Sequence, residues 1–306
     1  SIAINSIIKL ADGNEMPIFG LGTYQLTRQE AYDSSVAAVE KDYVLIDTAY
    51  LYQNEFECAK AIEDASRGKK IFVTSKLYTK HHGAEATARA AAFSQMACSA
   101  IDKHTSEAER KHKLKPIDLY LMHSPYGSKI VETWDAMLAA QAAGRVKSCG
   151  VSNFGVQHLE ALRNAGRPLP MVNQIELHPF NWKSRKELLE YCQKHKIAIT
   201  AYGSMLYGRK DGFLDHPILV DIAARHNKSV QQILLRWGIQ MGFAVIPRSK
   251  STKRVVDNAN IFDFTLPESD MNALCDIKHE RGLTLDAYWN PVDDCNNYDL
   301  GEFEKK

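Results

Sequence analysis

An aspartate and a tyrosine stand close together behind a short apolar run, and their side chains could move protons. Asp47 follows the run 44–46, and Tyr52 lies in the segment after it. A carboxylate at the end of a strand, with a phenol in the loop beyond it, is typical of chemistry sited on the loops of an α/β sheet or barrel. A structural role is the alternative, with Asp47 capping a helix that begins near Asn54 and Tyr52 packing at its edge. This stretch alone leaves both interpretations open.

A lysine and a histidine follow later apolar runs and could complete a proton-transfer group. An isolated tyrosine has a pKa of about 10, and a neighbouring ammonium lowers that pKa by favouring the phenolate. Lys76 could supply the ammonium for Tyr52, and Asp47 could keep Lys76 charged and oriented. His123 could direct a carbonyl oxygen toward the phenol. Taken singly, Lys76 could be a surface lysine and His123 a histidine with structural hydrogen bonds only.

The group contains a general acid, but it has neither an activated serine or cysteine nor a cluster of metal ligands. His104 and His112 could be imagined as metal ligands, yet no cysteine or carboxylate pattern accompanies them, so we expect no metal site. These features favour a reaction in which the protein side chains transfer a proton while another reagent supplies the electrons.

Chemistry of this kind needs strands whose ends meet, and the rest of the chain predicts such strands. Runs 4–10 and 15–18, joined by an Asp-Gly turn, indicate a hairpin that precedes the main fold. The expected strands after it are 19–22, 44–46, 71–74, 117–122, 146–151, 171–175, 197–202 and 243–246. The expected helices between and after them are 29–40, 54–66, 84–103, 130–143, 156–163, 184–195, 217–226 with 229–240, and 252–259. Because no linker interrupts the series, we expect one α/β domain over residues 1–306, a parallel (β/α)8 barrel of the TIM type.

Two segments depart from this alternation. Residues 105–115 are rich in charged side chains, and we interpret them as a solvated loop or an extension of the preceding helix. The tail 280–306 shows no clear period, yet Tyr288, Trp289 and Tyr298 argue against disorder there.

Composition and charge exclude several classes of protein. The chain has 306 residues, of which 45% are hydrophobic and 25% are charged, enough for a large core. A net charge of +1 gives the whole molecule no attraction for nucleic acid or an anionic membrane. The six cysteines lie far apart without a CxxC pair, so we expect reduced thiols in a cytoplasmic protein. The chain shows no signal sequence and no apolar run of about 18 residues, so neither secretion nor membrane spanning is expected.

The polar strand ends, taken in order, resemble the motifs of the aldo-keto reductase family. The fragments that carry the resemblance are Gly20-Leu21-Gly22-Thr23, Asp47-Thr48-Ala49 with Tyr52-Gln53-Asn54-Glu55, Thr74-Ser75-Lys76-Leu77, Leu121-Met122-His123-Ser124-Pro125, Gly150-Val151-Ser152-Asn153-Phe154, Asn173-Gln174-Ile175-Glu176-Leu177-His178-Pro179 and Ile246-Pro247-Arg248-Ser249. Each fragment is common, whereas the combination is specific. Gly20 and Gly22 do not belong to a Gly-x-Gly-x-x-Gly motif that opens a helix, so a Rossmann fold is disfavoured.

The resemblance implies hydride transfer from NADPH to an aldehyde or ketone, with Tyr52 as the proton donor. Asp47, Lys76 and His123 would act as argued above, and the cofactor would carry the electron chemistry. Residues that match the family's contacts to the nicotinamide are Ser152, Asn153 and Gln174 for the carboxamide and Tyr202 for the ring face. Further expected cofactor contacts are Gly22, Thr23, Asp47, Gly203, Ser204 and Met205.

The other half of the cofactor is matched near residue 250. Arg248, Ser249 and Arg254 match the family's group around the adenosine 2′-phosphate, and Asp257 and Asn258 match its positions beside the adenine. Two cations near a dianionic phosphate form charge-assisted contacts, so NADP should be preferred over NAD. A solvated helix start is the alternative for both arginines. The family more often has lysine at position 248, and arginine keeps the positive charge, so we expect the preference for NADP to be retained. The family more often has glutamate at position 257, so we expect the shorter aspartate to weaken the contact with the adenine.

The resemblance implies an aromatic substrate pocket formed by Tyr24, Tyr52, Tyr78, His123 and Trp289. The pocket should be somewhat roomy, because positions 24, 78 and 124 are often tryptophan in the family. Tyr288 and Trp289 lie in the tail that closes the mouth of the barrel in this family, although packing of the tail against the core would explain them equally well. Gly203-Ser204-Met205 stands where the family more often has Ser-Pro-Leu, so we expect the flap that closes over the pyrophosphate to differ in detail.

Two other functions are weighed against carbonyl reduction. A non-catalytic family member, either a redox-sensing accessory or a structural protein, would be expected to lack Tyr52, Lys76 or His123, and all three are present. A glycoside hydrolase on the same barrel needs two carboxylates that flank a bond, and Asp47 with Glu176 could supply them. Nothing else in the chain supports a hydrolase. We expect a small carbonyl compound as substrate, with no nucleic acid or membrane partner, and a monomer by family resemblance.

Overall fold

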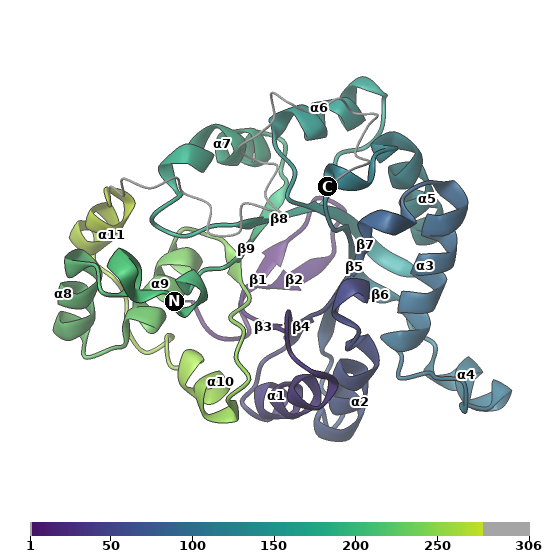
Figure 1. Cartoon of the computed structure of the whole chain (residues 1–306), viewed down its shortest axis with the longest axis horizontal. Helices are drawn as coiled ribbons and strands as arrows, with labels where there is room; N and C mark the ends of the chain where they lie inside the picture. The colour runs from purple at the N-terminus through teal and green to yellow at the C-terminus, as the bar shows by residue number, and fades with distance from the viewer. Residues whose placement is uncertain (1, 278–306) are drawn as a thin grey trace.

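Eight parallel strands form the centre of the protein, and helices surround them (Figure 1). The computed structural model describes residues 2–277. The strands are β3 (Leu21–Gly22), β4 (Leu45–Asp47), β5 (Phe72–Leu77), β6 (Ile117–Met122), β7 (Val146–Ser152), β8 (Val172–Glu176), β9 (Ala198–Tyr202) and β10 (Ala244–Val245). Each strand pairs with the next one along the chain. This order confirms the predicted (β/α)8 barrel.

The ring is closed by a short seam between its first and last strands. Gly20 N donates to Val245 O at 3.0 Å, and Gly22 N donates to Pro247 O at 3.0 Å. Parallel bridges join Phe19 to Val245 and Gly22 to Arg248. A side chain at position 22 would not fit this seam, because its Cβ would lie 2.7 Å from the backbone oxygen of Ile246.

The helices cover the outside of the strands. They are α1 (Arg28–Glu40), α2 (Glu55–Ala65), α3 (Ala84–Ala97), α4 (Glu107–Lys113), α5 (Ile130–Ala142), α6 (Val156–Asn164), α7 (Lys186–Lys194), α8 (Pro217–His226), α9 (Val230–Gln240), α10 (Thr252–Asn258) and α11 (Glu268–Cys275). Local sequence explains several of their starts, since Thr27 with Glu30 and Ser229 with Gln232 form capping boxes before α1 and α9. Within the described residues, no helix has both the length and the apolar character needed to cross a membrane.

The segment 105–115 forms a separate short helix, neither the loop nor the helix extension that we expected. Helix α3 ends at Ala97, well before the predicted end at 103. The Asp102 carboxylate accepts from the backbone of His104 at 2.9 Å and of Thr105 at 3.0 Å, which turns the chain. Ser106 then caps α4, which projects from the body at the lower right of Figure 1. Helix α11, which follows Pro267, also lies outside the predicted series.

The N-terminal hairpin closes one end of the barrel. Strands β1 (Ile7–Lys9) and β2 (Glu15–Pro17) pair antiparallel, as expected, and lie across the centre of the ring in Figure 1. Leu10 and Met16 belong to the buried cluster inside the barrel. At the start of β7, Ser148 Oγ donates to Asp12 Oδ2 at 2.6 Å and accepts from Asn14 Nδ2 at 2.9 Å. Because the hairpin covers the amino ends of the strands, the carboxyl ends are left to form a site.

Candidate active site

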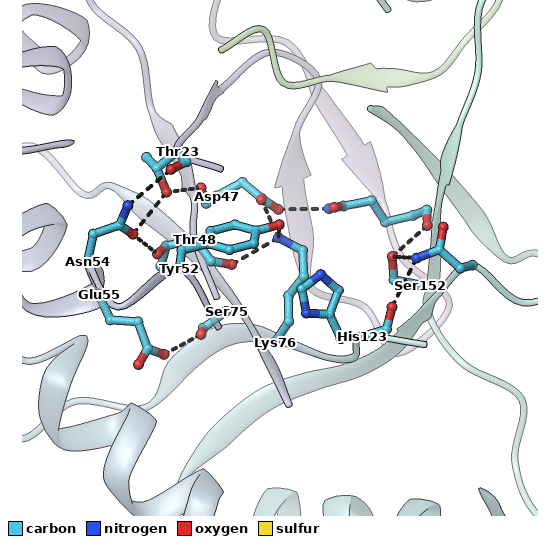
Figure 2. Close-up of polar contacts among 12 residues, drawn as sticks. Thr23, Asp47, Thr48, Tyr52, Asn54, Glu55, Ser75, Lys76, His123 and Ser152 are labelled. Atoms are coloured by element: carbon cyan, nitrogen blue, oxygen red, sulfur yellow. Dashed lines mark hydrogen bonds and ion pairs between the residues drawn. The ribbon is translucent and has the colours of Figure 1, made fainter. Parts of the chain in front are cut away.

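Four side chains that could transfer protons meet at the carboxyl ends of neighbouring strands. Asp47 ends β4, Lys76 lies near the end of β5, His123 directly follows β6, and Tyr52 lies in the short turn η1 (Tyr50–Tyr52). The Lys76 ammonium donates to the Asp47 carboxylate, to Thr48 O at 2.9 Å and to Tyr52 Oη at 3.3 Å. Figure 2 shows the Lys76 side chain between Asp47 and the Tyr52 ring, with the His123 imidazole beside it. The structure therefore brings all four predicted residues together.

Burial governs the charges of this group. Lys76 is 0% exposed and Asp47 is 2% exposed. Burial lowers the pKa of the Lys76 ammonium and raises the pKa of the Asp47 carboxyl, while their pairing acts in the opposite direction on both. Burial, and then the charge of Lys76, hold the pKa of His123 well below its ordinary value. The His123 imidazole is therefore neutral at neutral pH and can take part in hydrogen bonds without carrying charge.

Polar side chains from the next strands continue from this group. Gln174 Nε2 of β8 donates to Asp47 Oδ2 at 2.7 Å, and Gln174 O accepts from Ser152 Oγ at 2.8 Å. Asn153 Nδ2 donates to His123 O at 3.0 Å, and Asn153 Oδ1 accepts from Tyr202 Oη at 2.6 Å. These bonds orient the amide side chains of Asn153, which follows β7, and of Gln174 in β8 beside the four-residue group.

Asn54 joins two loops of the site and was not among the predicted site residues. Its Oδ1 accepts from Thr48 Oγ1 at 2.8 Å and from Thr23 Oγ1 at 3.3 Å. Its Nδ2 donates to Thr23 O at 3.0 Å and to Leu26 O at 3.1 Å. Asn54 precedes α2, where such a residue normally caps the helix, yet its side chain makes no cap bond. Its place in the Tyr-Gln-Asn-Glu fragment was the only signal in the sequence.

Replacing Asn54 with alanine is expected to lower the free energy of unfolding by about 3 kcal/mol, because buried hydroxyl and carbonyl groups lose their partner. Urea unfolding followed by circular dichroism measures this loss. The matched control is Asn164→Ala on the exposed end of α6, where a change below about 0.5 kcal/mol is expected. Equal losses in the two variants would contradict a special role for Asn54.

A cavity of about 510 Å³ opens beside the four-residue group. The predicted residues that line it are Gly22, Thr23, Tyr24, Asp47, Tyr52, His123, Ser152, Asn153, Gln174, Tyr202, Gly203, Ser204, Met205, Arg248, Ser249, Arg254, Asp257 and Asn258. Lys76 lies behind the lining, where it contacts Tyr52 Oη. All the expected cofactor residues therefore share one cavity.

One predicted substrate residue, Tyr78, is not part of this lining. The ring of Tyr78 packs against Tyr50, with centroids 6.5 Å apart, and against His81, with centroids 5.9 Å apart. Tyr78 is thus not among the residues that form the cavity wall. Trp289 lies outside the described residues, as do Tyr288, Tyr298 and the tail expected to close the mouth.

Sequence reasoning missed several residues of the cavity wall. They are Gln25, Leu51, Tyr207, Gly208, Ser229, Gln231, Ile246, Pro247 and Lys250. Lys250 could have been found, because it follows two predicted phosphate residues directly. Ser229 and Gln231 gave no such signal, since they cap and begin α9 in an ordinary way.

The two predicted arginines differ in their contacts. Arg248 Nε donates to Tyr24 O at 2.9 Å, and its Nη2 donates to Gln25 O at 3.1 Å. Arg254 lies in α10 and lines the cavity together with Lys250.

In residues 2–277, no cluster of three or more histidine, cysteine, aspartate or glutamate side chains is arranged to hold a metal ion.

Comparisons with known proteins agree with this geometry. A family model described as the aldo/keto reductase family matches residues 18–279. The chain is 37% identical to the glyoxal reductase of Bacillus subtilis over 274 residues, which are 89% of this chain and 92% of that protein. It is 33% identical to the methylglyoxal reductase DkgA of Escherichia coli, over 92% of this chain and 96% of that protein.

Solved structures give the same result for the fold. An aldo/keto reductase from Brucella melitensis superposes with a TM-score of 0.77 at 38% identity, covering 88% of this chain and 98% of that one. A mutant of Gox0644, solved in complex with NADPH, superposes with a TM-score of 0.79 at 34% identity, covering 90% of this chain and 94% of that one.

Proposed function

The chain belongs to the aldo/keto reductase family and is an NADPH-dependent oxidoreductase, and we propose that Tyr52 is the proton donor when it reduces a carbonyl compound. The observation that carries this proposal is the contact of the buried Lys76 ammonium with Tyr52 Oη at 3.3 Å. Family membership confirms the resemblance noted in the sequence. The non-catalytic alternative would be expected to lack Tyr52, Lys76 or His123, and all three side chains are present and meet at the site.

The cavity wall fits a phosphorylated dinucleotide. Arg248, Lys250 and Arg254 supply three cations from the segment after β10 and from α10. Asn153, which follows β7, and Gln174 of β8 supply amides, and Tyr202 of β9 supplies its ring. Charge-assisted hydrogen bonds to a 2′-phosphate suit the first group, and the carboxamide and flat ring of a nicotinamide suit the second. NADPH bound there supplies the hydride.

Each of the four residues has its own role in the proton transfer. Tyr52 gives its phenolic proton to the oxygen of the carbonyl substrate as that oxygen gains charge. The Lys76 ammonium stabilises the phenolate that remains, and Asp47 holds Lys76 in place through their ion pair. His123 is neutral, and it orients the carbonyl oxygen by a hydrogen bond. The Tyr24 ring lies 5.1 Å from the Tyr52 ring, centroid to centroid, and helps to exclude water.

A hydrolase on the same barrel is not supported by the position of the second carboxylate. Glu176 is fully buried, and its Oε1 contacts His178 Nε2 at 3.0 Å. Glu176 does not line the cavity, whereas Asp47 does. A pair of carboxylates that flanks a substrate bond is therefore not formed by these two residues.

Small α-dicarbonyl aldehydes are the proposed substrate class. The names of two relatives, a glyoxal reductase and a methylglyoxal reductase, support this choice. The test follows the absorbance of NADPH with methylglyoxal, glyoxal, a bulky aromatic ketone and an aldose sugar. Higher kcat/KM values are expected for the first two, and preference for the ketone or the sugar would contradict the proposed class.

The working unit is proposed to be a monomer in the cytoplasm. The four proposed catalytic residues meet within a single chain, so the proposed proton transfer needs no residue from a second copy. The five cysteines among the described residues are free thiols, which suits a reducing compartment. Light scattering coupled to size-exclusion chromatography tests the first point, since a dimer mass would contradict it.

Replacing Arg254 and Lys250 together with alanine is expected to raise the KM for NADPH by about a hundredfold, and the KM for NADH much less. NADH lacks the 2′-phosphate, so it loses no charge-assisted contact. Steady-state kinetics with both cofactors measure the difference. Arg89→Ala on the exposed face of α3 is the matched control and should change neither KM. An equal rise for both cofactors would refute the phosphate assignment.

A further inference from the structure

Arg248 holds the main chain of a loop that lies more than two hundred residues earlier in the sequence. Its planar guanidinium donates to two successive carbonyl oxygens, Tyr24 O at 2.9 Å and Gln25 O at 3.1 Å. The loop follows β3, and Gln25 has a left-handed φ of 57°. Leu26 N donates to Thr23 O at 3.2 Å and closes the turn. The guanidinium therefore clamps the tip of a tight turn.

Two side chains hold all four carbonyl oxygens of this turn. Asn54 Nδ2, from the buried side, donates to the first and the last, Thr23 O at 3.0 Å and Leu26 O at 3.1 Å. Arg248, from the exposed side, donates to the middle two. Without Arg248, the tip loses both of its side-chain donors and is held only at its ends.

The turn contributes directly to the catalytic end of the cavity. Tyr24 and Gln25 both line it. The Tyr24 ring lies 5.1 Å from the Tyr52 ring, centroid to centroid, at a tilt of 51°. A shift of the Tyr24 main chain therefore moves the ring that packs beside the proposed proton donor.

We propose that Arg248 is a positioning residue for the carbonyl substrate, acting through the main chain of Tyr24 and Gln25. This inference rests on the proposed function, because it assigns Tyr24 to the substrate side of the cavity. The positive charge available to bind a 2′-phosphate does not come from Arg248 alone, since Lys250 and Arg254 line the same cavity. The guanidinium has five N–H donors, so a phosphate contact and the two carbonyl contacts are compatible. Arg248 thus links the cofactor segment after β10 to the substrate wall.

The choice of cofactor separates this role from a role at the phosphate. A residue that acts only on the 2′-phosphate changes the KM for NADPH, and it leaves the KM for NADH and the KM for the carbonyl substrate unchanged. A residue that places Tyr24 affects carbonyl turnover with both cofactors. The KM of Arg248→Ala and Arg248→Lys for methylglyoxal is therefore measured at saturating NADPH and, separately, at saturating NADH, and the KM for each cofactor is measured at saturating methylglyoxal. Arg254→Ala serves as the comparison for a residue at the phosphate, and Arg89→Ala serves as the control for loss of an exposed arginine.

Arg248→Ala is expected to raise the KM for methylglyoxal by about tenfold with either cofactor. Arg248→Lys is expected to keep the KM for NADPH within about threefold of the original, while the KM for methylglyoxal stays raised, because one ammonium cannot reproduce a planar pair of bonds to two carbonyls. Arg254→Ala should raise the KM for NADPH more than the KM for NADH and leave the KM for methylglyoxal unchanged. An unchanged methylglyoxal KM with NADH in Arg248→Ala would overturn the proposal.

Hydrogen exchange of the backbone gives a second measurement that does not depend on turnover. Amides of residues 23–26 should exchange faster in both Arg248 variants than in the original protein and in Arg89→Ala. Unchanged exchange would overturn the clamp whatever the kinetics show. A protein with no carbonyl turnover before any substitution would instead refute the proposed function, so the two failures are distinguishable.

Discussion

Tyr52→Phe is expected to lower kcat for carbonyl reduction by about a thousandfold or more, because the substrate oxygen loses its proton donor. Phenylalanine keeps the ring that packs 5.6 Å from His123 and 5.1 Å from Tyr24, so the cavity keeps its shape. Binding of NADPH should therefore stay within about a factor of two of the original. Absorbance of NADPH measures kcat, and quenching of protein fluorescence measures the affinity.

The control for this substitution is Tyr32→Phe. Tyr32 lies in α1 and its hydroxyl donates to Asp64 at 2.9 Å, outside the cavity. The Tyr32→Phe substitution likewise removes one tyrosine hydroxyl group, and it should leave kcat unchanged. A Tyr52→Phe variant with kcat within a few-fold of the original would refute the proton-donor role.

Lys76→Met is expected to lower kcat by about a hundredfold or more and to lower the free energy of unfolding by about 3 to 5 kcal/mol. The first effect follows because the phenolate of Tyr52 loses its ammonium. The second follows because the Asp47 carboxylate is left buried without its cation. Assays of turnover and denaturant unfolding measure the two effects separately.

A double variant separates stability from catalysis. Lys76→Met combined with Asp47→Asn removes both charges, so much of the stability should return while kcat stays low. Full recovery of kcat in the double variant would show that the lysine acts through stability alone.

The stability of the single Lys76→Met variant should also depend on pH. Burial raises the pKa of the Asp47 carboxyl, and loss of the Lys76 ammonium removes the main influence that lowers it. A carboxyl whose pKa is higher in the folded than in the unfolded state contributes stability below the unfolded value, about 3.9, that is lost as the pH rises through the folded value. The deficit in melting temperature should therefore grow from about pH 4 toward neutrality. A deficit that shrinks over that range would contradict this account.

The barrel and the meeting of the four proposed catalytic residues could be predicted because both depend on a simple rule. Apolar runs alternate with amphipathic stretches, and the last residue of each run lies at the same end of a parallel barrel. Asp47, Lys76 and His123 follow different runs, so the fold alone was enough to bring them together. The predicted strands β6 and β9 match the structure closely, since Ile117–Met122 was expected in full and Ala198–Tyr202 within one residue.

Contacts over long sequence separations could not be predicted in this way. Arg248 was assigned to a phosphate from its charge and its motif, and neither shows that its guanidinium reaches carbonyls 223 and 224 residues away. Tyr78 was assigned to the pocket because it matches a position that is often tryptophan in the family, yet its ring packs toward Tyr50 and His81. Both directions are decided by tertiary packing, which no local pattern encodes.

Helix α4 is a different kind of miss, because its signal was present. Ser106 and Glu109 have the spacing of a capping box, and the structure shows both reciprocal bonds. The surrounding charges, rather than the cap, guided the expectation of a loop or an extension. Asn54 shows the converse, since a residue at a cap position bonds to two loops instead of to its own helix.

The seam that closes the ring has a consequence for how the protein is made. Strands β3 and β10 have two residues each, and the bonds that join them pair residues near position 20 with residues near position 245. A growing chain on the ribosome therefore carries an incomplete ring, with two open sheet edges, until the residues near position 248 have emerged. Nascent chains halted before β10 should accordingly be recognised by chaperones, and release from them should coincide with the arrival of the last strand.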